Sequence, residues 1–343
     1  MTGSLLPLPV ALRYALAGFA LCVLLTSLAL GPNLANAQTT AHAVRVGVLS
    51  DRTPAGPERA FFDAFRSALR QHGWVEGSNL TLIERFAGDD VHRLPTLAAE
   101  LVAARVDVIF ATTLPAALAA QGSTREIPIV FNVLSDPVEQ GLIGALARPG
   151  GNVTGMAINS STLIPKRLQF LKEAMPQLKR VAVLLDPDQG DACEAAWSAL
   201  REPAQAMGVT LERVPAGGTA DYAHVFSLIA RHHLQAVLVP ATTRFYNDAR
   251  TIARLASMHR IVVLPPIGDV AEDDALLVYG PRQVDAYERA ASYIDRVLRG
   301  ADPATLPVEQ PTRYELVLNK RVARALGVRF PRALSVRADR VIE

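Results

Sequence analysis

Residues 127–159 read IPIVFNVLSDPVEQGLIGALARPGGNVTGMAIN. The apolar run at 127–131 predicts a strand that is buried on both faces of a parallel sheet. This run gives way to small polar residues, namely Asn132, Ser135 and Asp136. Ligands bind at the carboxyl ends of strands in open α/β sheets, so we expect these three side chains at the rim of a crevice.

The rest of this stretch predicts a change of lobe. We expect a helix at 138–147, followed by a Pro-Gly-Gly break at 149–151 and a second short strand at 152–158. We place the passage from one lobe to another at the break.

Strand and helix patterns alternate through the rest of the chain, which predicts an α/β fold with parallel sheets. The other expected strands are 44–49, 80–86, 106–111, 181–186, 210–214, 235–240 and 261–264, and the expected helices are 57–72, 92–104, 115–121, 192–207, 222–231 and 248–259. A chain of 343 residues exceeds the roughly 250–300 residues at which a single core usually splits. We therefore expect two Rossmann-like lobes.

The second half of the chain repeats the first, including the polar ends of its strands. The matching segments are 46–51 with 181–186, 106–113 with 235–243, and 127–136 with 260–269. In the first match, Asp51 and Asp186 occupy equivalent positions. One βαβαβα unit present twice explains these matches, although βαβ units also look alike by chance because they share one pattern. Two strands, at 152–156 and 276–280, then follow the units and are expected to cross between the lobes.

The expected organisation has three parts joined by short connections. They are a signal peptide at 1–37, an N-terminal lobe at 44–156 plus about 277–305, and a C-terminal lobe at 157–276 plus about 306–343. A helix expected at 281–298 should pack on the first lobe. Residues 306–312 should be extended, and a helix expected at 315–326 should return to the second lobe. Such crossings form a multi-strand hinge, so a small ligand between the lobes can hold them closed.

The start of the chain has the features of a secretory signal. Residues 15–30 are apolar and uncharged, Arg13 precedes them, and Ala-Asn-Ala at 35–37 supplies a cleavage site, so the mature chain should begin at Gln38 in the periplasm. A retained membrane anchor is the alternative, but the apolar run falls short of the roughly 20 residues that span a bilayer. Cys22 is a poor candidate for lipidation because it lies inside the apolar run.

Composition and motifs exclude several kinds of function. The 35 Lys and Arg residues nearly balance the 33 Asp and Glu residues, which argues against nucleic acid or an anionic membrane surface as the partner. Cys193 is the only cysteine outside the signal, so we expect no intramolecular disulfide. The dinucleotide fingerprint, the Walker loop, the H-E-x-x-H zinc motif and the nucleophile elbow are all missing from the sequence. We therefore expect no cofactor, no metal and no catalysis.

Polar residues at the expected strand ends remain as candidates for a binding site. Hydroxyls and the first N–H groups of the following helices suit a carboxylate, and aspartates suit an ammonium group. Each of these residues alone is equally well explained as a helix N-cap, and only their convergence favours binding. The candidate ligand-binding residues are Ser50, Asp51, Thr112, Thr113, Asn132, Ser135, Asp136, Asn159, Asp186, Thr242 and Tyr279.

Several motifs carry a resemblance to a known family. They include ARPGGNVTG at 147–155, Tyr-Gly-Pro at 279–281, LPVEQPT at 306–312 and the tail RADRVIE at 337–343. In this order, over the whole mature chain, they resemble the substrate-binding proteins of ABC transporters related to TrpX.

The resemblance implies a monomeric periplasmic binding protein of the type I-like, two-lobed fold. It would capture a small solute, such as an aromatic or aliphatic amino acid, and deliver it to ABC permease and ATPase subunits in the inner membrane. The chain departs from the family at 113–115, where Thr-Leu-Pro stands in place of a frequent Gly-Thr-Pro, and again at 240–244. These departures leave the identity of the solute open.

Two other functions are compatible with the same sequence. A ligand-sensing periplasmic protein would use the same lobes to report a solute to a receptor. A two-lobed lyase or racemase would instead use Asp136 with a nearby hydroxyl, and only measured turnover would support that reading.

Overall fold

The computed structural model describes residues 43–54, 57–88, 90–188, 190–265 and 273–343. The expected signal peptide at 1–37, its cleavage site and Cys22 lie outside the described residues, as does the end of the segment at 260–269. Residues 43–343 form one compact unit. Within the described ranges, no helix has the length and hydropathy required to cross a membrane.

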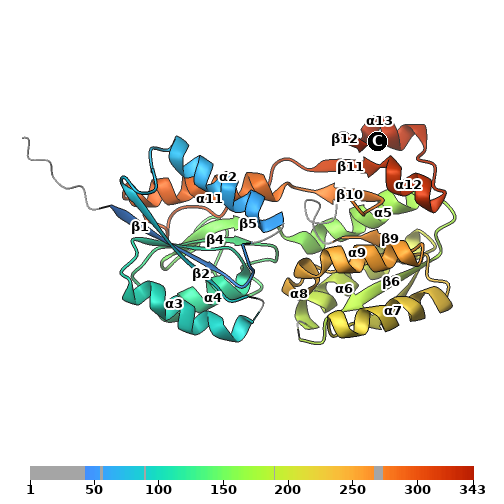
Figure 1. Cartoon of the computed structure of the whole chain (residues 1–343), viewed down its shortest axis with the longest axis horizontal. Helices are drawn as coiled ribbons and strands as arrows, with labels where there is room; N and C mark the ends of the chain where they lie inside the picture. Colours follow the sequence, from blue (N-terminus) through green and yellow to red (C-terminus); the bar gives the residue numbers. More distant parts are fainter. Residues whose placement is uncertain (1–42, 55–56, 89, 189, 266–272) are drawn as a thin grey trace, which may run out of the picture. The chain divides into compact units, whose positions relative to one another are not determined.

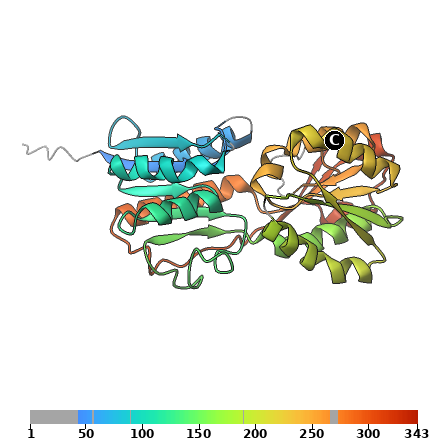
Figure 2. The same cartoon turned by 90° about the horizontal axis from the view of Figure 1, so that it is seen from below.

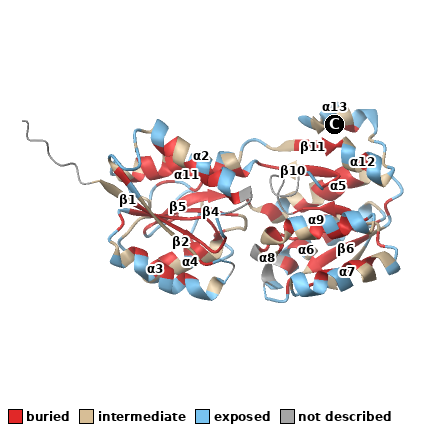
Figure 3. Ribbon diagram, viewed as in Figure 1, coloured by how far each residue is buried: buried red, intermediate tan, exposed pale blue. Residues whose placement is uncertain are grey.

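Sheet A is a five-stranded sheet with the order β2-β1-β3-β4-β5, and all its strands run parallel. Its strands are β1 (Val44–Ser50), β2 (Leu80–Phe86), β3 (Val108–Ala111), β4 (Ile129–Val133) and β5 (Val153–Ala157). Every residue of β3, β4 and β5 is buried, and Figure 3 shows the buried residues around β4 and β5 in red. Helices cover both faces of this sheet, which explains why its central strands are continuous apolar runs.

Two layers of helices enclose sheet A (Figure 1). The helices on one face are α2 (Pro57–Gln71) and α11 (Gln283–Leu298), and those on the other are α3 (Leu94–Ala103), preceded by the short η1 (Val91–Arg93), and α4 (Leu114–Ser123). Although α11 follows the second half of the chain, it lies beside α2 in both views (Figure 1 and Figure 2). The ring of Tyr287 on α11 lies 5.5 Å from those of Phe61 and Phe62, and 5.4 Å from that of Phe110.

Sheet B is a four-stranded parallel sheet with the order β7-β6-β8-β9. Its strands are β6 (Arg180–Leu185), β7 (Thr210–Pro215), β8 (Ala236–Leu238) and β9 (Val262–Leu264), and its helices are α5 (Ile164–Ala174), α6 (Gly190–Ala206), α7 (Thr219–Arg231), α8 (Thr243–Asn247) and α9 (Ala249–Met258), with η2 (Ser160–Leu163) before α5. The order repeats β2-β1-β3-β4 of sheet A, as one unit present twice predicts. The α/β fold with two parallel sheets is therefore confirmed.

A third, smaller sheet completes the chain. It consists of β10 (Leu277–Gly280), β11 (Glu315–Asn319) and β12 (Arg340–Ile342), accompanied by α12 (Lys320–Leu326) and α13 (Arg332–Arg337). β10 pairs antiparallel with β11, and β11 pairs parallel with β12. The two strands expected to be equivalent therefore differ, because β5 extends sheet A whereas β10 pairs with β11.

Two predicted helices are wrong in whole or in part. Residues 138–147 form turns, in which Asp136 Oδ1 accepts the N–H of Val138 at 2.9 Å and Gly141 has a φ of 69°. The predicted helix at 315–326 begins as strand β11, because the apolar residues there pair with β10. Its helical part starts at Lys320, where Asn319 Oδ1 accepts the N–H of Val322 at 3.0 Å as an N-cap.

The chain reaches sheet A once more after α11. The N–H of Glu309 donates to the carbonyl of Gly155 at 3.0 Å, and the carbonyl of Glu309 accepts the N–H of Ala157 at 3.0 Å. Thr154 Oγ1 also donates to the carbonyl of Leu306 at 2.9 Å. Residues 306–309 therefore run along the outer edge of β5 before the chain reaches β11.

Gly155 provides a test of this close packing, because its φ is 150° and a Cβ added there would meet the backbone nitrogen of Phe131 at 2.6 Å. The backbone of β4 is hydrogen-bonded to strands on both sides and has little room to move, so we expect Gly155→Ala to lower the free energy of unfolding by at least about 3 kcal/mol. Urea denaturation measures this change. Gly122→Ala, in open space within α4, is the control and should be neutral or stabilising by up to about 1 kcal/mol. Equal stability of the two variants would contradict the described geometry.

Candidate functional site

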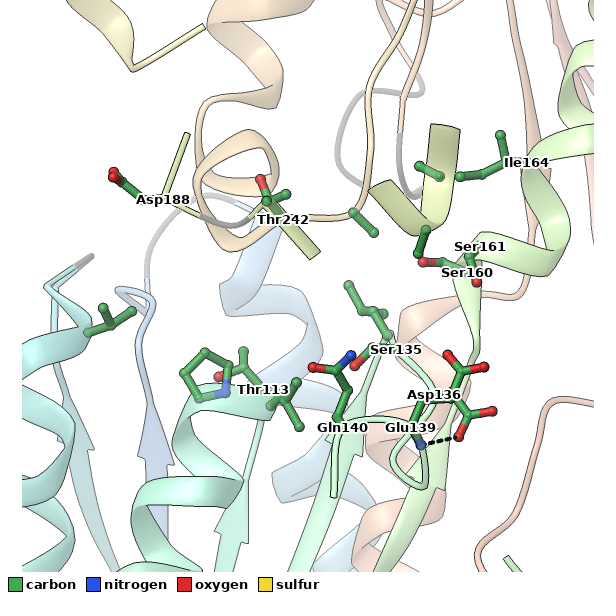
Figure 4. A pocket seen from close by; sticks show the side chains of 18 of the residues that line it. Thr113, Ser135, Asp136, Glu139, Gln140, Ser160, Ser161, Ile164, Asp188 and Thr242 are labelled. Atoms are coloured by element: carbon green, nitrogen blue, oxygen red, sulfur yellow. Dashed lines mark hydrogen bonds between the residues drawn. The ribbon is translucent and has the colours of Figure 1, made fainter. Parts of the chain in front are cut away.

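A cavity of about 400 Å³ lies at the carboxyl ends of strands from both parallel sheets. Sheet A contributes Arg52 after β1, Thr113 after β3, and Ser135 and Asp136 after β4. Figure 4 shows Thr113, Ser135 and Gln140 on one side of the cavity.

The opposite side of the cavity comes from the chain after β5 and from sheet B. Ser160 and Ser161 follow β5, Asp188 follows β6, and Thr242 follows β8. Figure 4 shows Thr242 and Ser160 facing Thr113 and Ser135 across the space. Apolar side chains complete the lining, among them Leu114, Leu134 and Ile164. Hydroxyls, carboxylates and an apolar wall together suit a small polar solute with an aliphatic or aromatic part.

The structure brings four of the eleven candidate residues to this cavity: Thr113, Ser135, Asp136 and Thr242. The other seven are not part of its lining: Ser50, Asp51, Thr112, Asn132, Asn159, Asp186 and Tyr279.

Asp136 accepts hydrogen bonds from the turn that follows it and also lines the cavity. Its Oδ1 accepts the N–H groups of Val138 at 2.9 Å and Glu139 at 3.3 Å, and its Oδ2 accepts a hydrogen bond from Asn159 Nδ2 at 3.2 Å. Asn159 has a φ of 45°, which an asparagine tolerates better than most residues. These bonds fix the carboxylate at the wall of the cavity, where it lies among the lining residues (Figure 4).

The two threonines of the lining are helix N-caps. Thr113 Oγ1 accepts the N–H of Ala116 at 3.4 Å at the start of α4, and Thr242 Oγ1 accepts the N–H of Phe245 at 3.2 Å at the start of α8. Both residues are almost fully buried. Capping and lining are therefore compatible at these positions.

Ser50 and Thr112 form a buried pair behind the cavity. Thr112 Oγ1 donates to Ser50 Oγ at 2.7 Å, and Ser50 Oγ also accepts the N–H of Arg52 at 3.2 Å. These bonds join the ends of β1 and β3. Asp51 is also fully buried, with Oδ1 at 4.0 Å from Arg52 Nε.

Asp186 and Asn132 likewise make internal contacts. Asp186 is 1% exposed, and its Oδ1 accepts the N–H of Asp188 at 3.1 Å and lies 3.2 Å from Arg244 Nε. Arg244 also forms an ion pair with Asp188, which does line the cavity. Asn132 Nδ2 donates to Gln283 Oε1 at 3.2 Å, which ties β4 to the start of α11.

Tyr279 belongs to an aromatic cluster of the third sheet. Its ring centroid lies 4.9 Å from that of Phe170 and 6.0 Å from that of Tyr314. Its carbonyl accepts a hydrogen bond from Arg167 Nε at 2.8 Å. Burial lowers the pKa of Arg167 to about 10, so this guanidinium stays charged at neutral pH.

Arg52 is the main lining residue that the sequence analysis missed. It is 4% exposed, its Nη1 donates to Glu58 Oε1 at 3.0 Å, and its guanidinium carbon lies 3.6 Å from the centre of the Tyr246 ring. Glu58 Oε2 in turn accepts a hydrogen bond from the Tyr287 hydroxyl at 3.3 Å. Burial lowers the pKa of Arg52, but Glu58, Tyr246 and Asp51 outweigh this effect and leave the pKa above its ordinary value. The sequence contained a signal for Arg52 as a lining residue, because Arg52 directly follows the polar end of the first strand.

The other polar lining residues that were missed are Glu139, Gln140, Ser160, Ser161 and Asp188. All of them lie between three and seven residues after the end of β4, β5 or β6. Among the residues that the structure describes, no three His, Cys, Asp or Glu side chains are grouped as a metal site requires.

The pair of Arg52 and Glu58 gives a stability prediction, since neither side chain is more than 6% exposed. Glu58→Gln removes the nearest carboxylate from a buried cation, so we expect a loss of about 3 kcal/mol of unfolding free energy. Asp63→Asn breaks the exposed pair with Arg59 and should cost less than about 0.5 kcal/mol. Chemical denaturation of both variants measures the difference, and similar losses would contradict a buried charge pair.

The chain is similar to known proteins in sequence and in fold. Residues 58–342 match the family described as ABC transporter substrate binding protein. The tyrosine-binding protein of Clostridioides difficile (strain R20291) is 24% identical over 266 residues, which cover 77% of this chain and 75% of that protein.

Solved structures show the same fold. The ABC domain of Streptococcus pneumoniae in complex with L-Trp has a TM-score of 0.79 at 22% identity, covering 87% of this chain and 99% of that one. A conserved domain protein from Vibrio cholerae has a TM-score of 0.80 at 25% identity, with the same two coverages. Because the family match spans most of the sequence, this chain belongs to the ABC transporter substrate-binding protein family.

Proposed function

We propose that this protein captures an amino acid in the periplasm and delivers it to the permease and ATPase subunits of an ABC importer. The observation that carries the proposal is the cavity itself, which the ends of two repeated βαβ units line from opposite sides. Its volume of about 400 Å³ falls within the range of about 300–1,000 Å³ that is usual for small-molecule sites.

The polar groups of the cavity suffice for a useful affinity. A micromolar dissociation constant requires about −8 kcal/mol. Hydrogen bonds to charged groups contribute roughly 1.5–3 kcal/mol each, so four or five of them reach this value. Hydroxyls of Thr113, Ser135 and Thr242, together with the Asp136 carboxylate, supply such groups. Apolar contact with Leu134 and Ile164 offsets part of the freedom that the solute loses.

An amino acid is the solute class that the relatives support. One relative is named a tyrosine-binding protein, and one solved neighbour holds L-Trp. In this chain the Asp136 carboxylate suits the ammonium group of such a solute, while hydroxyls and the N-terminus of α4 at Thr113 suit its carboxylate.

The mode of action follows from the two-lobed organisation. In this proposal one lobe contains sheet A and the other contains sheet B, and the solute stabilises the closed arrangement by contacting both. The protein acts as a monomer, its signal peptide is removed after Ala37, and it makes and breaks no covalent bond.

Thermal unfolding tests the proposal directly. The purified chain starting at Gln38 should unfold at a higher temperature with one or more amino acids from a panel of the twenty, because a solute that binds the folded state stabilises it. Mass spectrometry of material released by gentle denaturation would identify a co-purified solute. The absence of any stabilisation across the panel would contradict an amino-acid solute.

A substitution at the cavity wall gives a sharper prediction. Asp136→Asn removes one charge and should weaken binding of the identified solute about tenfold or more, as calorimetry would measure. Asp302→Asn is the matched control, because Asp302 Oδ1 also accepts a backbone N–H, from Ala304 at 3.0 Å, but does not line the cavity. Unchanged affinity in Asp136→Asn would exclude the carboxylate from solute binding.

A further inference from the structure

The end of the chain has a charge distribution that solute capture does not use. Residues 320–343 contain one lysine and six arginines but only one aspartate and one glutamate. The whole chain, by contrast, is nearly balanced, which by itself argues against an anionic membrane surface as the partner, but that balance does not describe residues 320–343. The excess lies on α12, α13 and β12, which cluster together in the red part of Figure 1. Except for Lys320, all of these basic residues are exposed.

Helix α13 presents an apolar side chain within this basic region. Leu334 is 1% exposed and anchors the helix, while Val336 is 77% exposed. Arg332 precedes Val336 by four residues, so both lie on the face opposite Leu334. Val336 is the most exposed large hydrophobic side chain of the described residues. The packing of α13 does not explain why Val336 is exposed beside an arginine.

The basic region continues onto α5. The guanidinium of Arg337 lies 5.0 Å from the centre of the Phe170 ring, and Lys166 Nζ lies 5.1 Å from the same ring. Arg332 and Val336 lie on α13 together with Arg337, and Arg329 precedes Arg332 by three residues. We call Lys166, Arg329, Arg332, Val336 and Arg337 the C-terminal basic surface. Glu173 accepts a hydrogen bond from Arg337 at 2.7 Å and is the carboxylate paired with this surface.

The neighbouring cations differ from those of the C-terminal basic surface. Lys320 and Arg324 pair with Glu343, and Arg321 pairs with Asp273. Arg329 and Arg332 make no ion pair with any residue that the structure describes, and both are exposed. Their charges are therefore available to an external anion.

We propose that the C-terminal basic surface adsorbs the protein onto anionic phospholipid headgroups. Arginine binds phosphate through two parallel hydrogen bonds and is only weakly hydrated, which suits a headgroup layer. A single exposed valine between cations fits the boundary of headgroups and acyl chains, where an apolar side chain inserts while its charged neighbours meet phosphate. An acidic protein surface would satisfy the arginines but gives no account of the protruding valine.

Such adsorption is weak and reversible because few cations contribute. Each Lys or Arg near an anionic bilayer adds a modest and roughly similar share to the affinity. Adsorption of this kind keeps a solute-binding protein near the membrane that holds its transporter and still allows it to dissociate. This inference is independent of which solute the cavity takes, and even of whether it takes one.

Vesicle co-sedimentation tests the inference with the chain starting at Gln38. We expect binding to vesicles that contain one third phosphatidylglycerol in phosphatidylcholine, no binding to pure phosphatidylcholine, and loss of binding as salt rises from about 50 to 300 mM. The double variant Arg329→Gln/Arg332→Gln should bind about thirtyfold more weakly. Val336→Ser should weaken binding severalfold at the same net charge.

The double variant Arg125→Gln/Arg148→Gln is the matched control, because both residues are exposed and lie in the sheet A half of the chain. It carries the same net charge and should bind vesicles like the unaltered protein. Equal binding of the two double variants, or equal partition onto both kinds of vesicle, would overturn the inference. Thermal stabilisation by an amino acid should remain the same in all variants, so a failure of solute binding would be recognised separately.

Discussion

Parallel pairing of strands is the constraint on which the rest of this structure depends. Every strand in sheets A and B runs parallel to its neighbours, so the carboxyl ends of all strands in a sheet reach the same edge. Helices begin close to several of these ends, and their first N–H groups require acceptors. Polar residues at this edge therefore satisfy the backbone first. The cavity is lined by those polar residues that also face the opposite sheet.

The sequence predicted the fold well wherever apolar runs were long. The strand at 80–86 was predicted with its observed limits, and the repeat of the strand order in sheet B followed from matching strand ends. The predicted helix at 138–147 is wrong because Asp136 caps a turn and Gly141 adopts a positive φ. Both features override a weak helical pattern. Residues 315–319 were predicted as helix but form strand β11. Their partner strand, β10, is distant in sequence, and no local pattern indicates such a pairing.

The site was predicted less completely for a similar reason. A sequence shows that a hydroxyl follows a strand, but not toward which side it turns. Ser50 and Thr112 bond to each other, whereas Thr113, the next residue, faces the cavity. Arg52 was missed because a cation after an aspartate reads as a solvated residue. Its burial between Glu58 and Tyr246 depends on helices α2 and α8, which come from different halves of the chain.

The late position of α11 in the sequence determines when the first half of the protein can finish folding. Tyr287 fills a gap among Phe61, Phe62 and Phe110, yet it is made only after all of sheet B has been synthesised. Residues 306–309, which cover the edge of β5, appear later still. A nascent chain therefore lacks one wall of its first core until nearly the whole polypeptide exists, although domains usually fold in order as they emerge from the ribosome. Until these segments are made, the first core lacks part of its packing, and an incompletely packed chain is the form that can be threaded through a narrow translocation channel.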